Sequence, residues 1–171
     1  MIVILQEMPS FYDWVAVKKR ALVTVGKYAK TEPSEEWKRK MLIAKHSPIR
    51  RLQFSFYIEC PYWVSVHLCR HVHAQPYVKS QRNDRQSEHD RNTAPQNETV
   101  SMIWDMNAEE LINIANKRLC MLASPETRAV VEEMCKQVIS ILPEFETVLV
   151  PNCKANGGVC HEMFPCGKMN N

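Results

Sequence analysis

The sequence predicts a single α+β domain, a small mixed fold with few strands and several helices. The chain has 171 residues, enough to bury one hydrophobic core. Its apolar residues recur with strand periodicity in short runs and with helical periodicity in longer ones. The expected order is strand, two helices, strand, helix, loop and two helices, which indicates the α+β class because the two element types do not alternate regularly.

The first half of the chain supplies both predicted strands. Residues 1–5 form a short apolar run, and residues 52–58 alternate apolar and polar side chains with a period of two. Between them, residues 11–26 have apolar side chains at helical spacing and end at a glycine, the usual stop signal. A serine followed by two glutamates predicts a second helix over 34–45. A proline suited to a first helical turn predicts a third helix over 61–73.

The second half begins with a polar segment. Residues 79–99 are charged and hold almost no aliphatic side chain, so we expect a long mobile loop there. Asn107 can cap a helix that extends to about residue 122, with Glu110 as its reciprocal capping partner. Ser124 and the proline after it open a last helix, which should end near residue 142.

Composition excludes several classes of protein. The formal charge of +3 is small, so we expect no nucleic-acid polymer as partner. No stretch approaches the roughly 18–20 consecutive apolar residues that cross a bilayer, and we expect no membrane association. The N-terminus lacks the features of a signal peptide. A cytoplasmic protein with mostly reduced cysteines is therefore predicted.

The chain divides into a domain over residues 1–150 and a cysteine-containing tail over 151–171. The tail holds four side chains able to ligate a metal, namely Cys153, Cys160, His161 and Cys166. Their spacing contains no CxxC pair and matches no common zinc module. We expect no metal there, with a metal site as the alternative.

One face of the predicted helix over 61–73 could carry chemistry. Trp63, His67, Arg70 and His71 share that face, where they could present charge-assisted donors to a phosphate or an anionic ring. The alternative is a partly buried face whose polar groups are satisfied internally. His67 and His71 also have the i,i+4 spacing of a zinc pair, but no glutamate that could act as general base lies between them.

Arg118 stands in the apolar stripe of the helix that Asn107 caps. A cation among core positions needs compensation, either from a structural ion pair at a subunit interface or from a bound anion. Asn113, Asn116 and Lys117 lie on the other side and are expected to face solvent. The basic loop over 79–91 could also recognise phosphate, or could simply be solvated.

Three segments resemble the flavin-dependent thymidylate synthase family. Its signature is Arg-His-Arg, seven arbitrary residues and Ser, and the extended form has another Arg two places later. Arg70-His71 and Ser80-Gln81-Arg82 resemble that signature, with Val72 in place of its third residue. The segment His46-Ser47-Pro48 and the stretch 104–118 are similar to the family's flanking segments. A short loop over 83–101 spans the place of a longer helical segment, as in a short, divergent, phage-type member.

The resemblance implies a homotetramer of α+β subunits with FAD bound between subunits. It implies reductive methylation of dUMP at C5 to dTMP, with methylenetetrahydrofolate as carbon donor and NADPH as reductant. The implied catalytic residues are Arg118 and Ser80. The implied FAD-binding residues are Arg70, His71, His46 and Asn113, and the implied dUMP-binding residues are Ser80, Gln81, Arg82 and Arg118.

Three alternatives remain open at this stage. A divergent homologue could make another C5-modified deoxyuridine nucleotide. A homologue without catalysis could bind nucleotides as a sensor or assembly partner. A small interaction module could instead bind a metal through the Cys/His tail.

Overall fold

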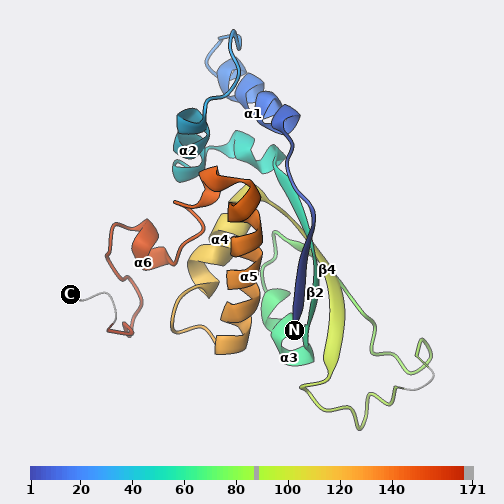
Figure 1. The fold of residues 1–171 in the computed structure, drawn as a ribbon. Helices are drawn as coiled ribbons and strands as arrows, with labels where there is room; N and C mark the ends of the chain where they lie inside the picture. The colour runs from blue at the N-terminus through green and yellow to red at the C-terminus, as the bar shows by residue number, and fades with distance from the viewer. Residues whose placement is uncertain (87–88, 168–171) are drawn as a thin grey trace.

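The structure is a computed structural model that describes residues 1–86 and 89–167. Its centre is one antiparallel sheet in the order β1-β2-β4-β3 (Figure 1), formed by β1 (Ile2–Glu7), β2 (Gln53–Pro61), β3 (Gln75–Val78) and β4 (Thr99–Asn107). The helices are α1 (Phe11–Val23), α2 (Glu35–Ile43), α3 (Tyr62–Leu68), α4 (Ala108–Arg118), α5 (Pro125–Ile141) and α6 (Asn152–Ala155), with 3-10 helices η1 (Ser47–Arg51) and η2 (Pro143–Phe145). The predicted α+β class is confirmed.

The two long central strands form the floor of the core. Their inward side chains alternate along each strand and are almost fully buried: Phe54, Phe56, Ile58, Met102, Trp104 and Met106. Helices α4 and α5 cover this face of the sheet, with α3 at one end of it (Figure 1). The sheet therefore fixes the positions of α3 and α4, and with them the polar residues at the ends of these two helices.

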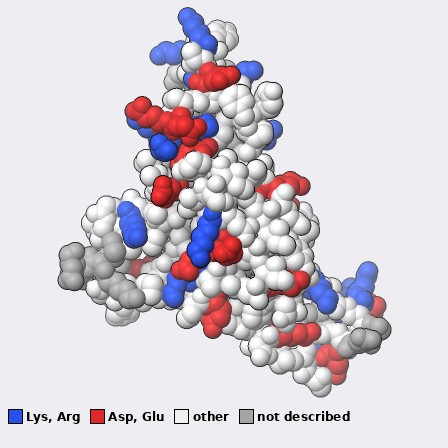
Figure 2. All heavy atoms as spheres, viewed as in Figure 1, with Lys and Arg blue, Asp and Glu red and all other residues white. Residues whose placement is uncertain are grey.

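Helices α1 and α2 form a separate layer beyond one end of the sheet (Figure 1). Ser10 caps α1 in a reciprocal capping box with Asp13, and Ser34 caps α2 as predicted. Trp14 and Leu42 pack this layer onto the core. On the face shown in Figure 2, basic and acidic side chains are interspersed and neither sign forms a continuous field.

The predicted helix over 61–73 is wrong at both ends. Pro61 is the last residue of β2, and α3 ends at Leu68. Because the following residues must reverse direction to bring β3 antiparallel to β4, the chain leaves the helix in a turn closed by the His71 N–H and the Leu68 carbonyl. Arg70 and His71 therefore extend from a turn and not from a helix face.

Two strands were missing from the prediction. Strand β3 contains Pro76, and β4 begins at Thr99, the last residue of the segment expected to be loop, and continues through a stretch for which no element was predicted. The loop itself is confirmed between β3 and β4, and Asn107 caps α4 by accepting from the Glu110 N–H. Helix α4 ends at Arg118 and not near residue 122. In the described part of the chain, no helix has the length and apolarity needed to cross a membrane.

Candidate functional site

Arg118, in the last turn of α4, is held by two neutral acceptors. Its Nε–H donates to Nε2 of His71 at 2.9 Å, and its Nη2 donates to the backbone carbonyl of His67 at 3.2 Å. The side chain is half-buried. Within residues 1–86 and 89–167, no carboxylate lies within ion-pair distance of this guanidinium. The charge of Arg118 is thus oriented but not neutralised.

His71 is a neutral imidazole. Burial, followed by the positive charge of Arg118, lowers the pKa of His71 to about 4. The hydrogen bond from Arg118 requires an unprotonated Nε2, so the proton sits on Nδ1. The ring packs against Trp104, with centroids 6.1 Å apart. Nε2 of His71 therefore accepts from the Arg118 cation, and Nδ1 carries the proton and can act as a donor.

That proton faces Glu110, the third residue of α4. Nδ1 of His71 lies 3.6 Å from Oε1 of Glu110, and only 5% of Glu110 is exposed. Burial, as the largest cause, raises the pKa of the Glu110 carboxyl. Because His71 is neutral, this contact is between a carboxyl group and a neutral N–H and is not a salt bridge.

A second guanidinium lies near the first. Arg70 is exposed, and its charge adds to burial, the larger cause, in lowering the pKa of Arg118. Among the residues that the structure describes, Arg70 has no carboxylate within ion-pair distance either. Two neighbouring cations without acidic partners are an arrangement that an anionic ligand would stabilise.

A polar cleft of about 310 Å³ lies beside Glu110. It is lined by Arg50, His73, Asn107, Glu109, Glu110 and Asn113. Across it, Arg50 pairs with Glu109, and the resulting contact lowers the pKa of Glu109. Asn113 is exposed and accepts a hydrogen bond from Nζ of Lys45 at 2.9 Å.

His46 is exposed at the start of η1, directly after Lys45. Lys45 has the left-handed backbone conformation, with a φ of 46°, which is uncommon for a residue with a side chain. This conformation ends α2 and lets Nζ of Lys45 reach the oxygens of Asn113 and Asn116 on α4. His46 and Asn113 are thus brought to the same side of the molecule through Lys45.

The loop triplet Ser80, Gln81 and Arg82 lies elsewhere. Arg82 forms a bidentate pair with Asp84 at 2.6 and 2.9 Å, and Gln81 and Arg82 line a separate open cavity of about 510 Å³. In Figure 1 their loop projects beyond the end of the sheet, away from α4. No hydrogen bond or ion pair between described residues joins the triplet to Arg118. One chain therefore presents two separate groups of cations.

Sequence reasoning gave Glu110 only a capping role and placed Asn116 on the solvated face. Both residues are buried. Asn116 donates to the carbonyls of Val148 at 3.1 Å and Val150 at 2.7 Å, which fixes the chain after η2 against α4. The signal for Glu110 was its spacing of four residues from Ile114, which places it on the edge of the apolar stripe.

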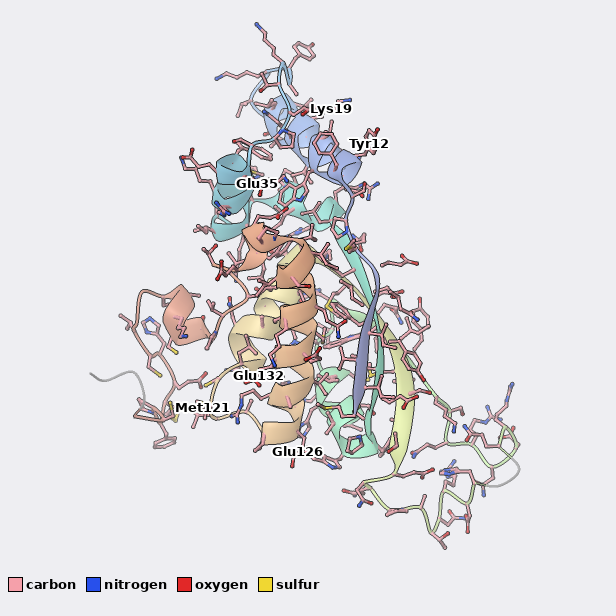
Figure 3. The ribbon with its side chains drawn as sticks, viewed as in Figure 1. Tyr12, Lys19, Glu35, Met121, Glu126 and Glu132 are labelled. Carbon is pink, nitrogen blue, oxygen red and sulfur yellow. The ribbon has the colours of Figure 1, made fainter. Side chains whose placement is uncertain are left out.

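His67 and His71, whose i,i+4 spacing lacks the glutamate of a zinc site, contact different partners. His67 packs edge-on against Trp63, with centroids 5.6 Å apart, whereas His71 accepts from Arg118. The tail cysteines line a cavity of about 420 Å³ together with Cys120 of the α4–α5 connection, and Met121 and Glu132 border it (Figure 3). Across residues 1–86 and 89–167, no three His, Cys, Asp or Glu side chains are arranged to hold a metal ion.

Comparison with known proteins gives one family match and a shared fold. Residues 83–144 match the family model described as thymidylate synthase complementing protein. No curated protein sequence matches the chain. Among solved structures, a UMP/dUMP methylase, PolB from Streptomyces cacaoi bound with 5-Br dUMP, is similar with a TM-score of 0.67 and 15% identity, covering 87% of this chain and 96% of that chain. The resemblance to the thymidylate synthase family is thus confirmed over residues 83–144 by the family model, and the chain shares its fold with the solved methylase.

Proposed function

We propose that this chain is an enzyme of the dUMP methylase kind, which adds one carbon to C5 of dUMP. The observation that carries the proposal is the pair of guanidiniums, Arg70 and Arg118, which have no acidic partner among the described residues; Arg118 is also oriented by two neutral acceptors. An anionic pyrimidine nucleotide supplies the missing charge. The matched family segment and the solved methylase of the same fold, bound with a dUMP analogue, support this choice of ligand.

The chemistry explains why a free cation is needed. C5 of uracil becomes nucleophilic when negative charge develops on the O2/N1 side of the ring, and a fixed guanidinium stabilises that charge. In the proposed reaction, C5 loses its proton and forms a bond to the methylene carbon of methylenetetrahydrofolate, whose two bonds to the folate nitrogens break. Hydride derived from NADPH completes the methyl group. The folate nitrogens take up two protons, one replacing the C5 proton and one from solvent, and dTMP, tetrahydrofolate and NADP⁺ are the products. Arg118 serves this role better than a salt-bridged arginine because His71 leaves its charge uncompensated.

Residues beside the cleft fit a flavin. Asn113 offers an amide, Lys45 and Arg70 offer cations for phosphates, and His46 and His71 offer imidazoles. We propose that Arg70, His71, His46 and Asn113 hold FAD. When bound, FAD would transfer the hydride from NADPH. The chain's own groups would orient the ring systems.

The loop triplet would complete the nucleotide site from a second copy. Ser80, Gln81 and Arg82 do not contact Arg118 within one chain, and their loop projects from the body of the subunit (Figure 1). A hydroxyl, an amide and a guanidinium together suit a phosphate. We therefore propose a homotetramer in which the loop of one subunit closes the Arg118 site of another.

The proposal is tested with the full chain, FAD, NADPH, methylenetetrahydrofolate and dUMP labelled with tritium at C5. Release of tritium with conversion of dUMP to dTMP is expected, and Arg118→Gln should abolish both. Tritium release with a product of a different mass would point to another C5-modified nucleotide. Binding of dUMP without tritium release would indicate that the chain binds the nucleotide but does not catalyse the reaction. Failure to bind dUMP or FAD would refute the proposal.

A further inference from the structure

Glu110 has a contact that its capping position does not explain. The N-cap of α4 needs only the backbone N–H of Glu110, which donates to Asn107 at 3.0 Å. The carboxyl group instead turns inward, where it is 95% buried and lies 3.6 Å from Nδ1 of His71. Burying a carboxyl is costly, so the helix gains no stability from placing this group inward.

The contacts run in one line from Glu110 to the cation. Glu110 faces the protonated nitrogen of His71, and the opposite nitrogen accepts from Nε of Arg118 at 2.9 Å. A neutral imidazole has two tautomers, and the partner of one nitrogen decides which lone pair the other presents. At 3.6 Å the Glu110 oxygen is too far for a hydrogen bond, but its proximity to Nδ1 favours the Nδ1–H tautomer. The lone pair is then on Nε2, where Arg118 needs it.

We propose that Glu110 is a positioning residue that acts through His71 to hold the Arg118 guanidinium in the orientation that receives the nucleotide. The choice of dUMP as the ligand rests on the proposed function, whereas the contact between Glu110 and His71 does not. Without Glu110, the Nε2–H tautomer of His71 becomes accessible, and its N–H would oppose that of Arg118. The guanidinium would then lose one of its two anchors, leaving the His67 carbonyl alone.

Two variants separate positioning from packing. Glu110→Gln keeps an oxygen that can accept from Nδ1, whereas Glu110→Met keeps the volume and removes the acceptor. Glu144→Met is the matched control, because Glu144 is also buried and its Oε1 lies 3.6 Å from a cation, Nζ of Lys38, in a different part of the molecule. Thermal unfolding of each variant shows which of them are folded.

The first readout uses no nucleotide. Nitrogen-15 NMR of histidine-labelled protein, with the His71 signal assigned from a His71→Gln sample, should show Nδ1 protonated in the wild type. Glu110→Met should lose this preference, while Glu110→Gln and Glu144→Met keep it. An unchanged His71 tautomer in folded Glu110→Met would overturn the proposal, whatever the protein binds.

The second readout is the dissociation constant of dUMP, measured by calorimetry. Glu110→Met should weaken binding roughly tenfold, the size of one lost hydrogen bond to a charged group, and Glu110→Gln by much less. In a His71→Gln background, Glu110→Met should cause no further loss, because the effect passes through His71. Equal losses in both backgrounds would overturn the proposal. A wild type that does not bind dUMP would refute the proposed function, and the tautomer would still decide the role of Glu110.

Discussion

Protonation of His71 should destabilise the fold in a defined pH window. In the unfolded chain the imidazole titrates near its ordinary pKa of 6.5, and in the folded protein burial and Arg118 lower the pKa of His71 to about 4. Between these values the unfolded state binds more protons, so the free energy of unfolding falls as the pH falls. The difference corresponds to about 3 kcal/mol, present at neutral pH and lost by about pH 4.

The assay is urea unfolding at several pH values between 7 and 4, for the wild type and for His71→Gln. The variant cannot titrate, yet its amide oxygen can still accept from Arg118. Other groups shift in the same range: the pKa of Glu110 is raised and acts in the opposite sense, while those of Asp13 and Glu109 are lowered. All three are present in both proteins, so their contributions largely cancel in the difference.

The stability of the wild type relative to His71→Gln should therefore fall by about 3 kcal/mol as the pH falls from 7 to 4. Two parallel stability curves would refute the reasoning, because they would mean that His71 titrates alike in folded and unfolded chains. A difference that grows toward low pH would mean that His71 is protonated in the fold and paired with Glu110.

Three further predictions concern binding and stability. Arg118→Gln should weaken dUMP binding at least about tenfold by calorimetry, whereas Arg128→Gln on α5 should leave binding unchanged; equal losses would show that net charge and not position matters. Asn116→Ala should lower the free energy of unfolding in urea by about 2 kcal/mol, because the buried carbonyl of Val148 and the part-buried carbonyl of Val150 lose their donor, and a loss near zero would contradict that role. Ser10→Ala should cost about 1 kcal/mol by removing the α1 cap, and an unchanged midpoint would show that the capping box contributes nothing.

Local signals predicted the fold where local interactions decide it. Ser34, Asn107 and Ser124 cap their helices as expected, because each cap needs only a side-chain oxygen and an N–H a few residues ahead. The alternation that marks β2 also marks β4, and this strand could have been predicted from residues 100–106.

The end of α3 is decided by strand pairing and not by a local sequence signal. Nothing between Leu68 and His71 stops a helix locally, since neither glycine nor proline lies there. The helix ends because β3 must pair with β4, a strand more than twenty residues further along the chain. The same reversal carries His71 out of the helix and toward α4.

The candidate site was predicted in part. The family resemblance selected His71 and Arg118 separately, and only the fold brings these residues together across 47 positions of sequence. The inward position of Glu110 was missed, because its spacing from Ile114 places it only at the edge of the apolar stripe and a carboxylate in the first turn of a helix is ordinarily a solvated dipole partner. Its inward orientation depends on the turn that places His71 beneath α4.

The most direct test of the central claim is the mass of the nucleotide product. The full chain is incubated with FAD, dUMP, NADPH and methylenetetrahydrofolate, and the nucleotides are separated and weighed by mass spectrometry, with Arg118→Gln in parallel. We predict a nucleotide one methylene group heavier than dUMP, dependent on every component and absent with the variant. Unchanged dUMP in a sample shown by calorimetry to bind both dUMP and FAD would contradict the assignment of this site to C5 methylation.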